Sequence, residues 1–146
     1  MNRKNFIKTC GFACLGGTAI TFMLEGCAST IYFGQSTFNN NIITIKKTEF
    51  FNGNEKRKVK RKYILIKTDQ FNYPIYVYKL NGDEYSALLM ECTHKGCELQ
   101  PQGSFLVCPC HGSEFTNKGV VQNPPAEQNL KSFIITSDNE NLYIQL

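Results

Sequence analysis

The sequence predicts an all-β domain of antiparallel sheets, and three observations lead to this prediction. The 146-residue chain is 42% hydrophobic and 19% charged, which is enough apolar material for a packed core. After residue 41, apolar and polar residues alternate in several short runs, as they do in half-buried strands. No segment after residue 30 repeats its apolar residues at the helical spacing. A chain of this length usually forms a single domain.

Seven runs are the expected strands. In the first, Ile43–Lys47, polar Thr44 separates two isoleucines. The others are rich in β-branched and aromatic residues and cover residues 63–66, 74–80, 85–90, 105–107, 133–136 and 142–146. Asn81-Gly82 lies between two of these runs, and this dipeptide is typical of a hairpin turn. Residues 138–141 are turn-like and separate the last two runs. Strands joined in this way pack as antiparallel sheets.

The charge distribution argues against nucleic acid as a partner. Residues 1–62 hold 11 Lys or Arg and 3 acids, whereas residues 63–146 hold 5 and 9. The net charge of +4 is small, and a nucleic-acid-binding domain would be expected to be basic rather than acidic. The densest run, residues 56–62, is interpreted as a solvated hairpin or edge strand whose lysines discourage edge-to-edge pairing. Attraction to anionic lipid headgroups or to an acidic partner is the alternative.

The first 26 residues have the pattern of an export signal. Arg3, Lys4 and Lys8 precede an uncharged run over residues 11–24, which is shorter than the about 20 residues of a membrane-spanning helix. Residues 2–8 resemble the twin-arginine export motif, with Lys4 in place of the second arginine. Two further cysteines inside this signal are interpreted as small apolar residues of it; they are Cys10 and Cys14.

The signal ends in Leu24-Glu25-Gly26-Cys27, which resembles a bacterial lipobox. This interpretation makes Cys27 the lipidated N-terminus of a protein on the periplasmic side of a bacterial membrane. The alternative is an uncleaved N-terminal anchor. Residues 27–41 contain turn formers without a steady period and are the expected tether. The folded domain is then expected over residues 42–146.

Two short segments concentrate the residues that bind metals. They are Cys92–Cys97, with the sequence C-T-H-K-G-C, and Cys108–Ser113, with the sequence C-P-C-H-G-S. Together they hold both histidines of the chain and four of its seven cysteines. Two thiolates and two imidazoles suit Zn²⁺ or an iron–sulfur cluster with mixed ligands. The identity of the ligands alone leaves both open.

The two segments, in this order, are similar to the two cluster-binding boxes of Rieske [2Fe–2S] proteins. They resemble the disulfide-containing branch, known from the iron–sulfur subunits of cytochrome bc-type complexes. The resemblance implies stacked antiparallel sheets with the cluster on a small inserted subdomain. It also implies that Cys92 and Cys108 bind one iron, while His94 and His111 bind the other, which lies nearer the surface.

The resemblance extends to residues around the cluster. Cys97 and Cys110 would form a disulfide between the two loops, which needs an oxidising compartment such as the export signal supplies. Gly96 and Gly112 would let the loops turn closely around the cluster. Residues 123–126, Asn-Pro-Pro-Ala, resemble the proline-rich loop that covers the cluster from a third side.

Three further positions bear on the potential and the partner. Ser113 matches a family serine whose hydroxyl bonds a bridging sulfide. Phe115 stands where high-potential members carry a tyrosine, and the loss of that donor lowers the expected potential. Lys95 stands where quinol-oxidising members carry an apolar residue. A charge is costly to bury in an apolar interface, so Lys95 favours a soluble acidic partner.

The expected function is that of a membrane-tethered one-electron carrier of relatively high potential, which exchanges electrons with a respiratory or oxidoreductase partner. One alternative is the Rieske subunit of a quinol–cytochrome c oxidoreductase or of an arsenite-oxidase-like complex, with quinol as a partner in the first case. Another is a non-redox module stabilised by zinc or by the disulfide. No motif in the sequence indicates a substrate pocket or a catalytic base. We therefore assign the domain no reaction of its own.

Overall fold

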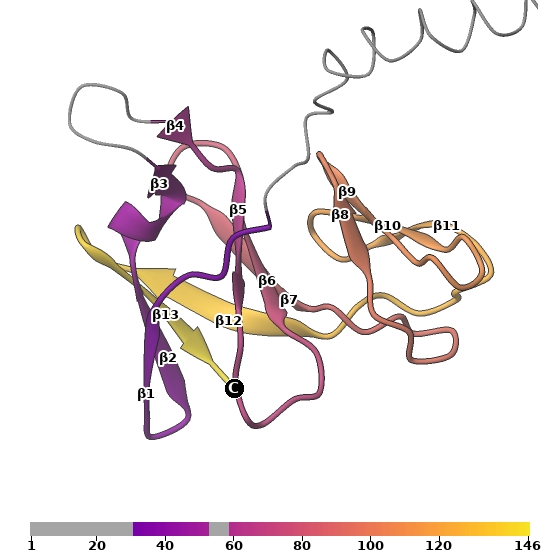
Figure 1. Cartoon of the computed structure of the whole chain (residues 1–146), viewed down its shortest axis with the longest axis horizontal. Coiled ribbons are helices and arrows are strands. Elements are labelled where there is room, and N and C mark those ends of the chain that lie inside the picture. The colour runs from indigo at the N-terminus through magenta and orange to yellow at the C-terminus, as the bar shows by residue number, and fades with distance from the viewer. Residues whose placement is uncertain (1–30, 53–58) are drawn as a thin grey trace, which may run out of the picture. The chain divides into compact units, whose positions relative to one another are not determined.

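Antiparallel strands make up nearly all the regular structure of the residues that the computed structural model describes, which are 31–52 and 59–146. The larger sheet contains β1 (Ser36–Asn39), β2 (Ile42–Lys46), β5 (Tyr63–Ile66), β6 (Ile75–Lys79), β7 (Tyr85–Leu89), β12 (Ser132–Ser137) and β13 (Asn141–Gln145). Its strand order is β1-β2-β13-β12-β7-β6-β5, and Figure 1 shows how strongly it curls.

Two smaller sheets accompany it. One contains β8 (Gln100–Gln102), β9 (Phe105–Val107), β10 (Glu114–Thr116) and β11 (Val121–Asn123), in the order β11-β10-β9-β8. The other pairs β3 (Phe51–Asn52) with β4 (Val59–Lys60) and follows a single 3-10 turn, η2 (Lys47–Phe50). The predicted all-β, antiparallel class is thus confirmed.

The larger sheet curls until one segment of chain touches both of its edge regions. This segment pairs through β1 with β2 and through Phe33 with Leu65 of β5. The Gly34 N–H donates to the Leu65 carbonyl at 2.9 Å, and the Leu65 N–H donates to the Tyr32 carbonyl at 3.0 Å. Residues 32–39 therefore connect the two ends of the sheet.

Strands β5 and β6 are buried on both faces because they lie between two apolar cores. Ile64 and Ile75 belong to the core inside the curl, whereas Leu65 and Tyr76 belong to a second core shared with the β8–β11 sheet. Neighbouring side chains along a strand point to opposite faces. This arrangement explains why both strands are apolar at consecutive positions, over residues 63–66 and 75–78, rather than at every second one.

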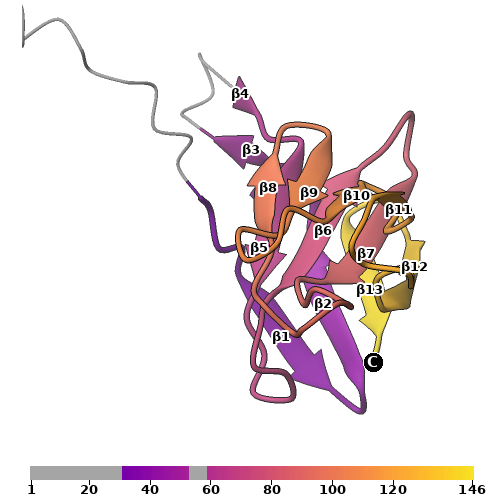
Figure 2. The ribbon, with the colours of Figure 1, turned by 90° about the vertical axis from the view of Figure 1, so that its right-hand side faces the viewer.

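The β8–β11 sheet belongs to an insertion between β7 and β12. These two strands pair directly, with Leu88 opposite Ser132, so the chain leaves the larger sheet and returns to the adjacent strand. Figure 2 shows the insertion in front of the larger sheet. The predicted stack of antiparallel sheets with a small inserted subdomain is therefore confirmed.

The chain joins the fold earlier than the sequence predicts. Residues 36–39 fall within the expected tether of residues 27–41, yet they form β1, and the compact unit begins at Ile31. All four side chains of β1 are exposed, so no apolar alternation indicates a strand there.

Several expectations fall on residues that lie outside the described part of the chain. These are the export signal over residues 1–26, the lipidation site Cys27 and the first half of the charge run, residues 56–58. Within residues 31–52 and 59–146, no helix has the length and apolar character that crossing a membrane requires.

The turn between β10 and β11 gives the first prediction. Gly119 has φ +82°, and a Cβ there would lie 2.8 Å from Leu88 Cδ2 and 3.4 Å from Leu130 Cβ. We expect Gly119→Ala to lower the free energy of unfolding by roughly 1–3 kcal/mol, because the side chain meets both backbone strain and crowding. Urea unfolding followed by circular dichroism measures this loss.

The matched control is Gly82→Ala, in the turn between β6 and β7. Gly82 also has a positive φ of +64°, but a Cβ there would meet nothing within 4 Å. Only the backbone cost of about 1 kcal/mol is expected. Equal losses in the two variants would contradict close packing of Gly119 against Leu88 and Leu130.

Candidate metal centre

Loop 1, residues 92–97, connects β7 to β8. The Cys92 N–H donates to the Cys97 carbonyl, and the Gly96 N–H donates to the Cys92 carbonyl, both at 2.8 Å. An isolated antiparallel bridge between Glu91 and Glu98 lies immediately outside the loop. These bonds hold the ends of the loop together and fix the backbone around Cys92.

Loop 2, residues 108–113, repeats this pattern between β9 and β10. The Cys108 N–H donates to the Ser113 carbonyl at 2.8 Å, and the Gly112 N–H donates to the Cys108 carbonyl at 2.9 Å. The two glycines occupy equivalent places, with φ +73° at Gly96 and +78° at Gly112. A Cβ on Gly112 would meet no atom within 4 Å, so glycine is required here for its backbone conformation.

The four cysteines of the two motifs converge between these loops. Cys97 and Cys110 form a disulfide with an S–S distance of 2.08 Å, which confirms the predicted pairing. Cys92 and Cys108 remain free thiols and are each only 1% exposed. The sulfur atoms of Cys97, Cys108 and Cys110 all lie within 4.8 Å of one another. Because disulfide sulfurs carry no thiolate, the sulfur donors available to a metal are the two free thiols.

The two free thiols lie beside each other in a dry environment. Burial is the largest cause that raises the pKa of the Cys92 thiol, and its hydrogen bond with Cys108 raises it further. The backbone N–H groups of His94 and Lys95 act in the opposite direction, because they donate to the sulfur. Thiols of this kind become ligands by losing their protons to a bound metal.

The two histidines meet at the outer end of the loops. The ring centroids of His94 and His111 lie 4.9 Å apart, with an interplanar angle of 85°. His111 is exposed and His94 is half-buried. The Nδ1 atom of His94 is buried and has no hydrogen-bond partner among the described residues. A ring nitrogen removed from water without a partner is costly, and a metal bond is one way to satisfy it.

A third loop, residues 123–128, is tied to both of the others. The Ser113 Oγ accepts a hydrogen bond from the Ala126 N–H at 3.0 Å. The Thr93 Oγ1 donates to the Gln128 carbonyl at 2.6 Å. Because the Ser113 hydroxyl accepts this bond, its own proton is free for another acceptor. The third loop includes the two prolines that the sequence analysis singled out, joined by a cis peptide bond.

Sequence reasoning missed two of these residues, Thr93 and Gln128. The only feature of the sequence that could have indicated Thr93 is the position of its hydroxyl between the expected ligands Cys92 and His94. Nothing in the sequence marks Gln128, because its backbone carbonyl makes the contact.

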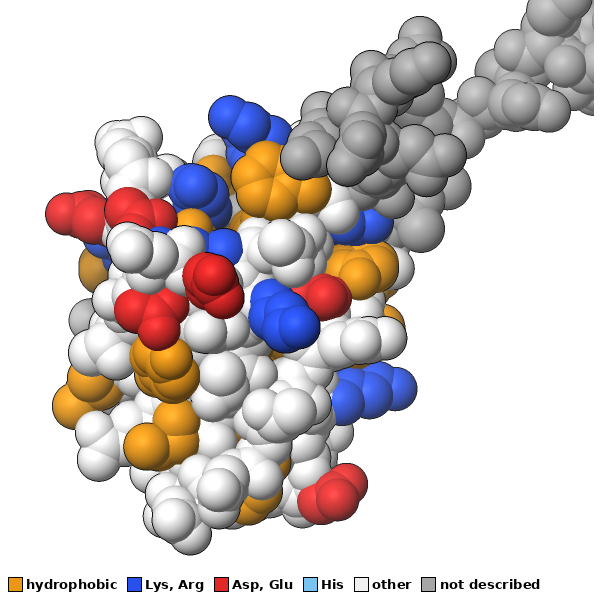
Figure 3. Space-filling view, turned by 90° about the vertical axis from the view of Figure 1, so that its left-hand side faces the viewer, with side chains coloured by type: hydrophobic (Ala, Val, Ile, Leu, Met, Phe, Trp, Pro, Cys, Tyr) orange, Lys and Arg blue, Asp and Glu red, His pale blue; other side chains and the backbone are white. Residues whose placement is uncertain are grey.

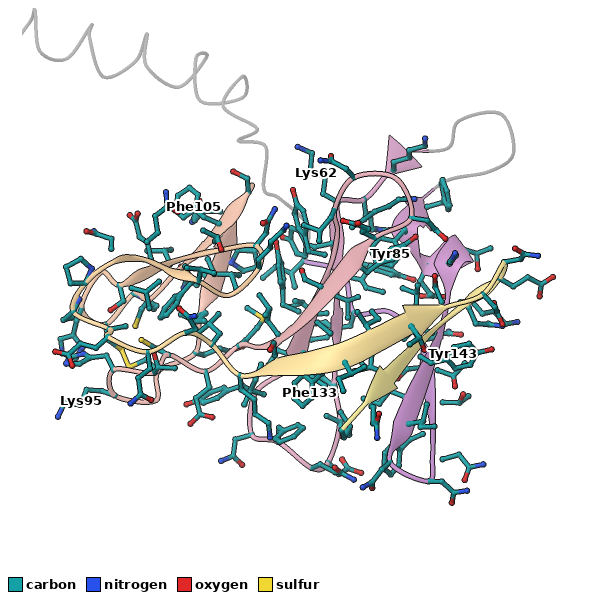
Figure 4. The ribbon with its side chains drawn as sticks, turned by 180° about the vertical axis from the view of Figure 1, so that it is seen from behind. Lys62, Tyr85, Lys95, Phe105, Phe133 and Tyr143 are labelled. Carbon is teal, nitrogen blue, oxygen red and sulfur yellow. A yellow bond between two sulfur atoms is a disulfide. The ribbon has the colours of Figure 1, made fainter. Side chains whose placement is uncertain are left out.

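The two positions that depart from the family pattern lie on opposite sides of this site. Phe115 is completely buried in β10, within the apolar core that also contains Cys92 and Cys108. Lys95 is exposed at the tip of loop 1. In Figure 4, Lys95 points away from the body, close to the sulfur atoms drawn in yellow.

The donor chemistry fits an iron–sulfur cluster with mixed ligands. The thiols come one from each loop, and so do the imidazoles. The thiols lie in the dry interior and the imidazoles at the surface. Such a set can bind two metal atoms unequally, with sulfur ligands at the inner one and nitrogen ligands at the outer one.

Comparison with known proteins points to the same chemistry. Residues 51–134 match the Rieske [2Fe-2S] domain. The ubiquinol-cytochrome c reductase iron-sulfur subunit of Rickettsia typhi is 37% identical over 67 residues, which are 42% of this chain and 38% of that protein. The cytochrome b6-f complex iron-sulfur subunit of Prochlorococcus marinus is 39% identical over 56 residues, which are 36% of this chain and 31% of that protein. The chain thus spans well under half the length of either relative.

A solved structure gives a longer match. The plasma membrane Rieske protein PetC3 of Synechocystis PCC 6803 is 28% identical, with a TM-score of 0.52. The match covers 58% of this chain and 87% of that one.

The contact between loop 2 and the third loop gives the second prediction. Ser113→Ala leaves the buried Ala126 N–H without an acceptor, so we expect the free energy of unfolding to fall by roughly 1–3 kcal/mol. We also expect faster hydrogen exchange at Ala126. Ser104→Ala, at an exposed position between β8 and β9, is the control and should change stability by less than about 0.5 kcal/mol. Unchanged exchange at Ala126 in the Ser113 variant would refute the role of this bond.

Proposed function

The chain belongs to the Rieske [2Fe-2S] domain family, and on this premise we propose that it is a membrane-tethered one-electron carrier of relatively high potential. The cofactor of this domain is a Rieske-type [2Fe–2S] cluster, which when bound supplies one-electron oxidation and reduction. The observation that carries the proposal is the convergence of one buried free thiol and one imidazole from each of two matched loops.

In the proposed site, the thiolates of Cys92 and Cys108 would hold one iron. The imidazoles of His94 and His111 would hold the other. The otherwise unpartnered Nδ1 of His94 supports this assignment. The Cys97–Cys110 disulfide keeps the two loops together beside these ligands without competing for the metal.

The relatively high potential follows from charge. Two thiolates instead of four leave the oxidised site less negative, so an electron is added more easily. The range for such clusters is about −150 to +300 mV, against about −400 mV for plant-type clusters held by four cysteines. The N–H groups of His94 and Lys95, which donate to the Cys92 sulfur, favour extra electron density there.

The path for electrons is at the histidine end of the loops. His111 and Lys95 are both exposed there, so a partner can approach closely without the domain opening. The positive charge of Lys95 favours an acidic surface on a soluble partner. The proposed lipid anchor at Cys27 would hold the domain at the periplasmic face of the membrane.

A second candidate is a subunit of a quinol-oxidising complex. It is favoured by the relatives, which are iron-sulfur subunits of ubiquinol-cytochrome c reductase and of the cytochrome b6-f complex. Lys95 argues against this candidate, because its charge at the tip of loop 1 would be costly to bury in an apolar quinol pocket. Copurification with a membrane-embedded cytochrome would favour this candidate, and recovery of the chain alone from solubilised membranes would favour the carrier.

The proposed cofactor is tested on the full chain, produced in cells with intact cluster assembly. We expect two irons and two sulfides per chain, with an electron paramagnetic resonance signal of low average g in the reduced state. Cys92→Ala should abolish both, whereas Cys10→Ala in the expected signal should change neither. A colourless protein that contains one zinc ion would overturn the proposal.

The potential provides a separate prediction. Phe115→Tyr adds a hydroxyl to the core around the two free thiols, so we expect the midpoint potential to rise, because a new donor near sulfur stabilises the reduced state. Redox titration of the full chain measures it. Phe105→Tyr, at a half-buried position on the neighbouring β9, is the control and should leave the potential unchanged. A fall, or no change, in the Phe115 variant would count against this assignment.

A further inference from the structure

A basic cleft of about 640 Å³ lies on the larger sheet's side of the molecule, around η2, β4 and the β6–β7 turn. Its lining contains five cations and two acids, which are Lys46, Lys47, Lys60, Arg61 and Lys79, with Asp83 and Glu140. Figure 3 looks onto this side and shows Lys and Arg side chains in its upper part. The cleft therefore has an excess of positive charge, although residues 63–146 as a whole are acidic.

Two of the five cations already have partners within the fold. Lys47 forms an ion pair with Asp83 at 2.5 Å, which holds the pKa of that carboxyl below its usual value. The Arg61 guanidinium donates to the carbonyls of Glu49, at 3.2 Å, and Phe51, at 2.8 Å. These contacts fix the walls of the cleft.

The other three cations, Lys46, Lys60 and Lys79, have no ion-pair partner among the described residues. Lys46 and Lys60 are exposed. Lys79 lies over the Tyr85 ring, with its ammonium 5.5 Å from the centroid. Three unpaired ammonium groups around one hollow are suited to several anionic groups presented close together.

The cleft adjoins residues 31–33, at the start of the compact unit. The Arg61 guanidinium lies 3.7 Å from the centroid of the Tyr32 ring. Ile31 and Phe33, on either side of Tyr32, are 53% and 44% exposed, and the Lys67 ammonium lies 4.7 Å from the Phe33 ring centroid. Exposed apolar side chains flanked by cations are typical of surfaces that lie at a membrane interface.

We propose that the basic cleft docks onto the anionic lipid headgroups of the membrane that holds the chain, an inference that rests on the proposed anchor at Cys27. The four peptide units from Cys27 to Ile31 span at most about 14 Å. The surface potential of a membrane decays over about 8 Å at physiological salt. An anchor at Cys27 on so short a segment lets the cleft reach this layer, where each lysine is attracted to the surface by a factor of about five.

Docking in this way leaves the candidate metal centre open to the aqueous phase. Tyr85, which lines the cleft, and Lys95, at the tip of loop 1, lie toward opposite ends of the body in Figure 4. A domain held by its cleft would present His111 and Lys95 to a soluble partner rather than to the headgroups.

The test measures lysine acetylation in the full chain after reconstitution into vesicles. One set of vesicles contains phosphatidylcholine alone and the other also contains phosphatidylglycerol. Mass spectrometry gives the labelling rate at each lysine. We expect Lys46, Lys60 and Lys79 to be labelled about fivefold more slowly in the anionic vesicles, with the protection lost at high salt. Lys95 and Lys131 should be labelled equally in both.

A pair of charge reversals makes the test specific to the cleft. Lys46→Glu should remove most of the protection of Lys60, whereas Lys131→Glu, with the same change of charge elsewhere on the surface, should leave it intact. Equal labelling of the cleft lysines in the two kinds of vesicle would overturn the proposal. Protection seen in native membranes but absent from pure lipid would overturn it in favour of an acidic protein partner.

The same samples separate this inference from the proposed function. Failure of the chain to remain with the vesicles would refute the anchor, before any labelling is compared. The reduced-state electron paramagnetic resonance signal reports on the carrier function alone and should be unaffected by Lys46→Glu. An intact signal with no protection would therefore refute only the docking of the cleft.

Discussion

The arrangement of the site depends on the burial of two thiols in the apolar core that joins the sheets. Cys92 and Cys108 are as inaccessible as the leucines around them, in the core that also contains Tyr76 of β6 and Phe115 of β10. The ends of both loops are therefore fixed by packing of the insertion against the outer face of β5–β7. A displacement of either loop would expose this core, so the positions of the histidines follow from the hydrophobic effect.

The remaining freedom of the loops is limited by links between them. The disulfide joins loop 1 to loop 2, and single side-chain hydrogen bonds join each of them to residues 123–128. Each loop is thus held to both of the others by bonds that do not involve the free thiols or the imidazoles. Ligands held in advance lose little entropy when they bind, which is a general requirement of sites that must keep one geometry in two charge states.

Much of this could be predicted from the sequence, and the exceptions have a physical cause. Strands such as β2, β6 and β13 bury one or both faces, so their apolar residues mark them. The strands β1, β8 and β11 are mainly exposed and exist through backbone pairing that composition does not reveal. In the site, the resemblance of the two cysteine–histidine motifs to the Rieske boxes implied the Cys97–Cys110 disulfide, which the structure contains, and the four proposed donors. The links made by Thr93 and Ser113 depend on where a distant loop lies, which no local pattern records.

The segment that connects both ends of the larger sheet limits how the domain can swing. Residues 32–39 bond to β5 on one side and to β2 on the other, so the first residues of the compact unit form part of its framework. A load applied at Ile31 is transmitted directly into the sheet, because Tyr32 and Gly34 are bonded through their backbones to Leu65 of β5. Residues 32–39 therefore turn together with the sheet and cannot act as a hinge while these bonds hold.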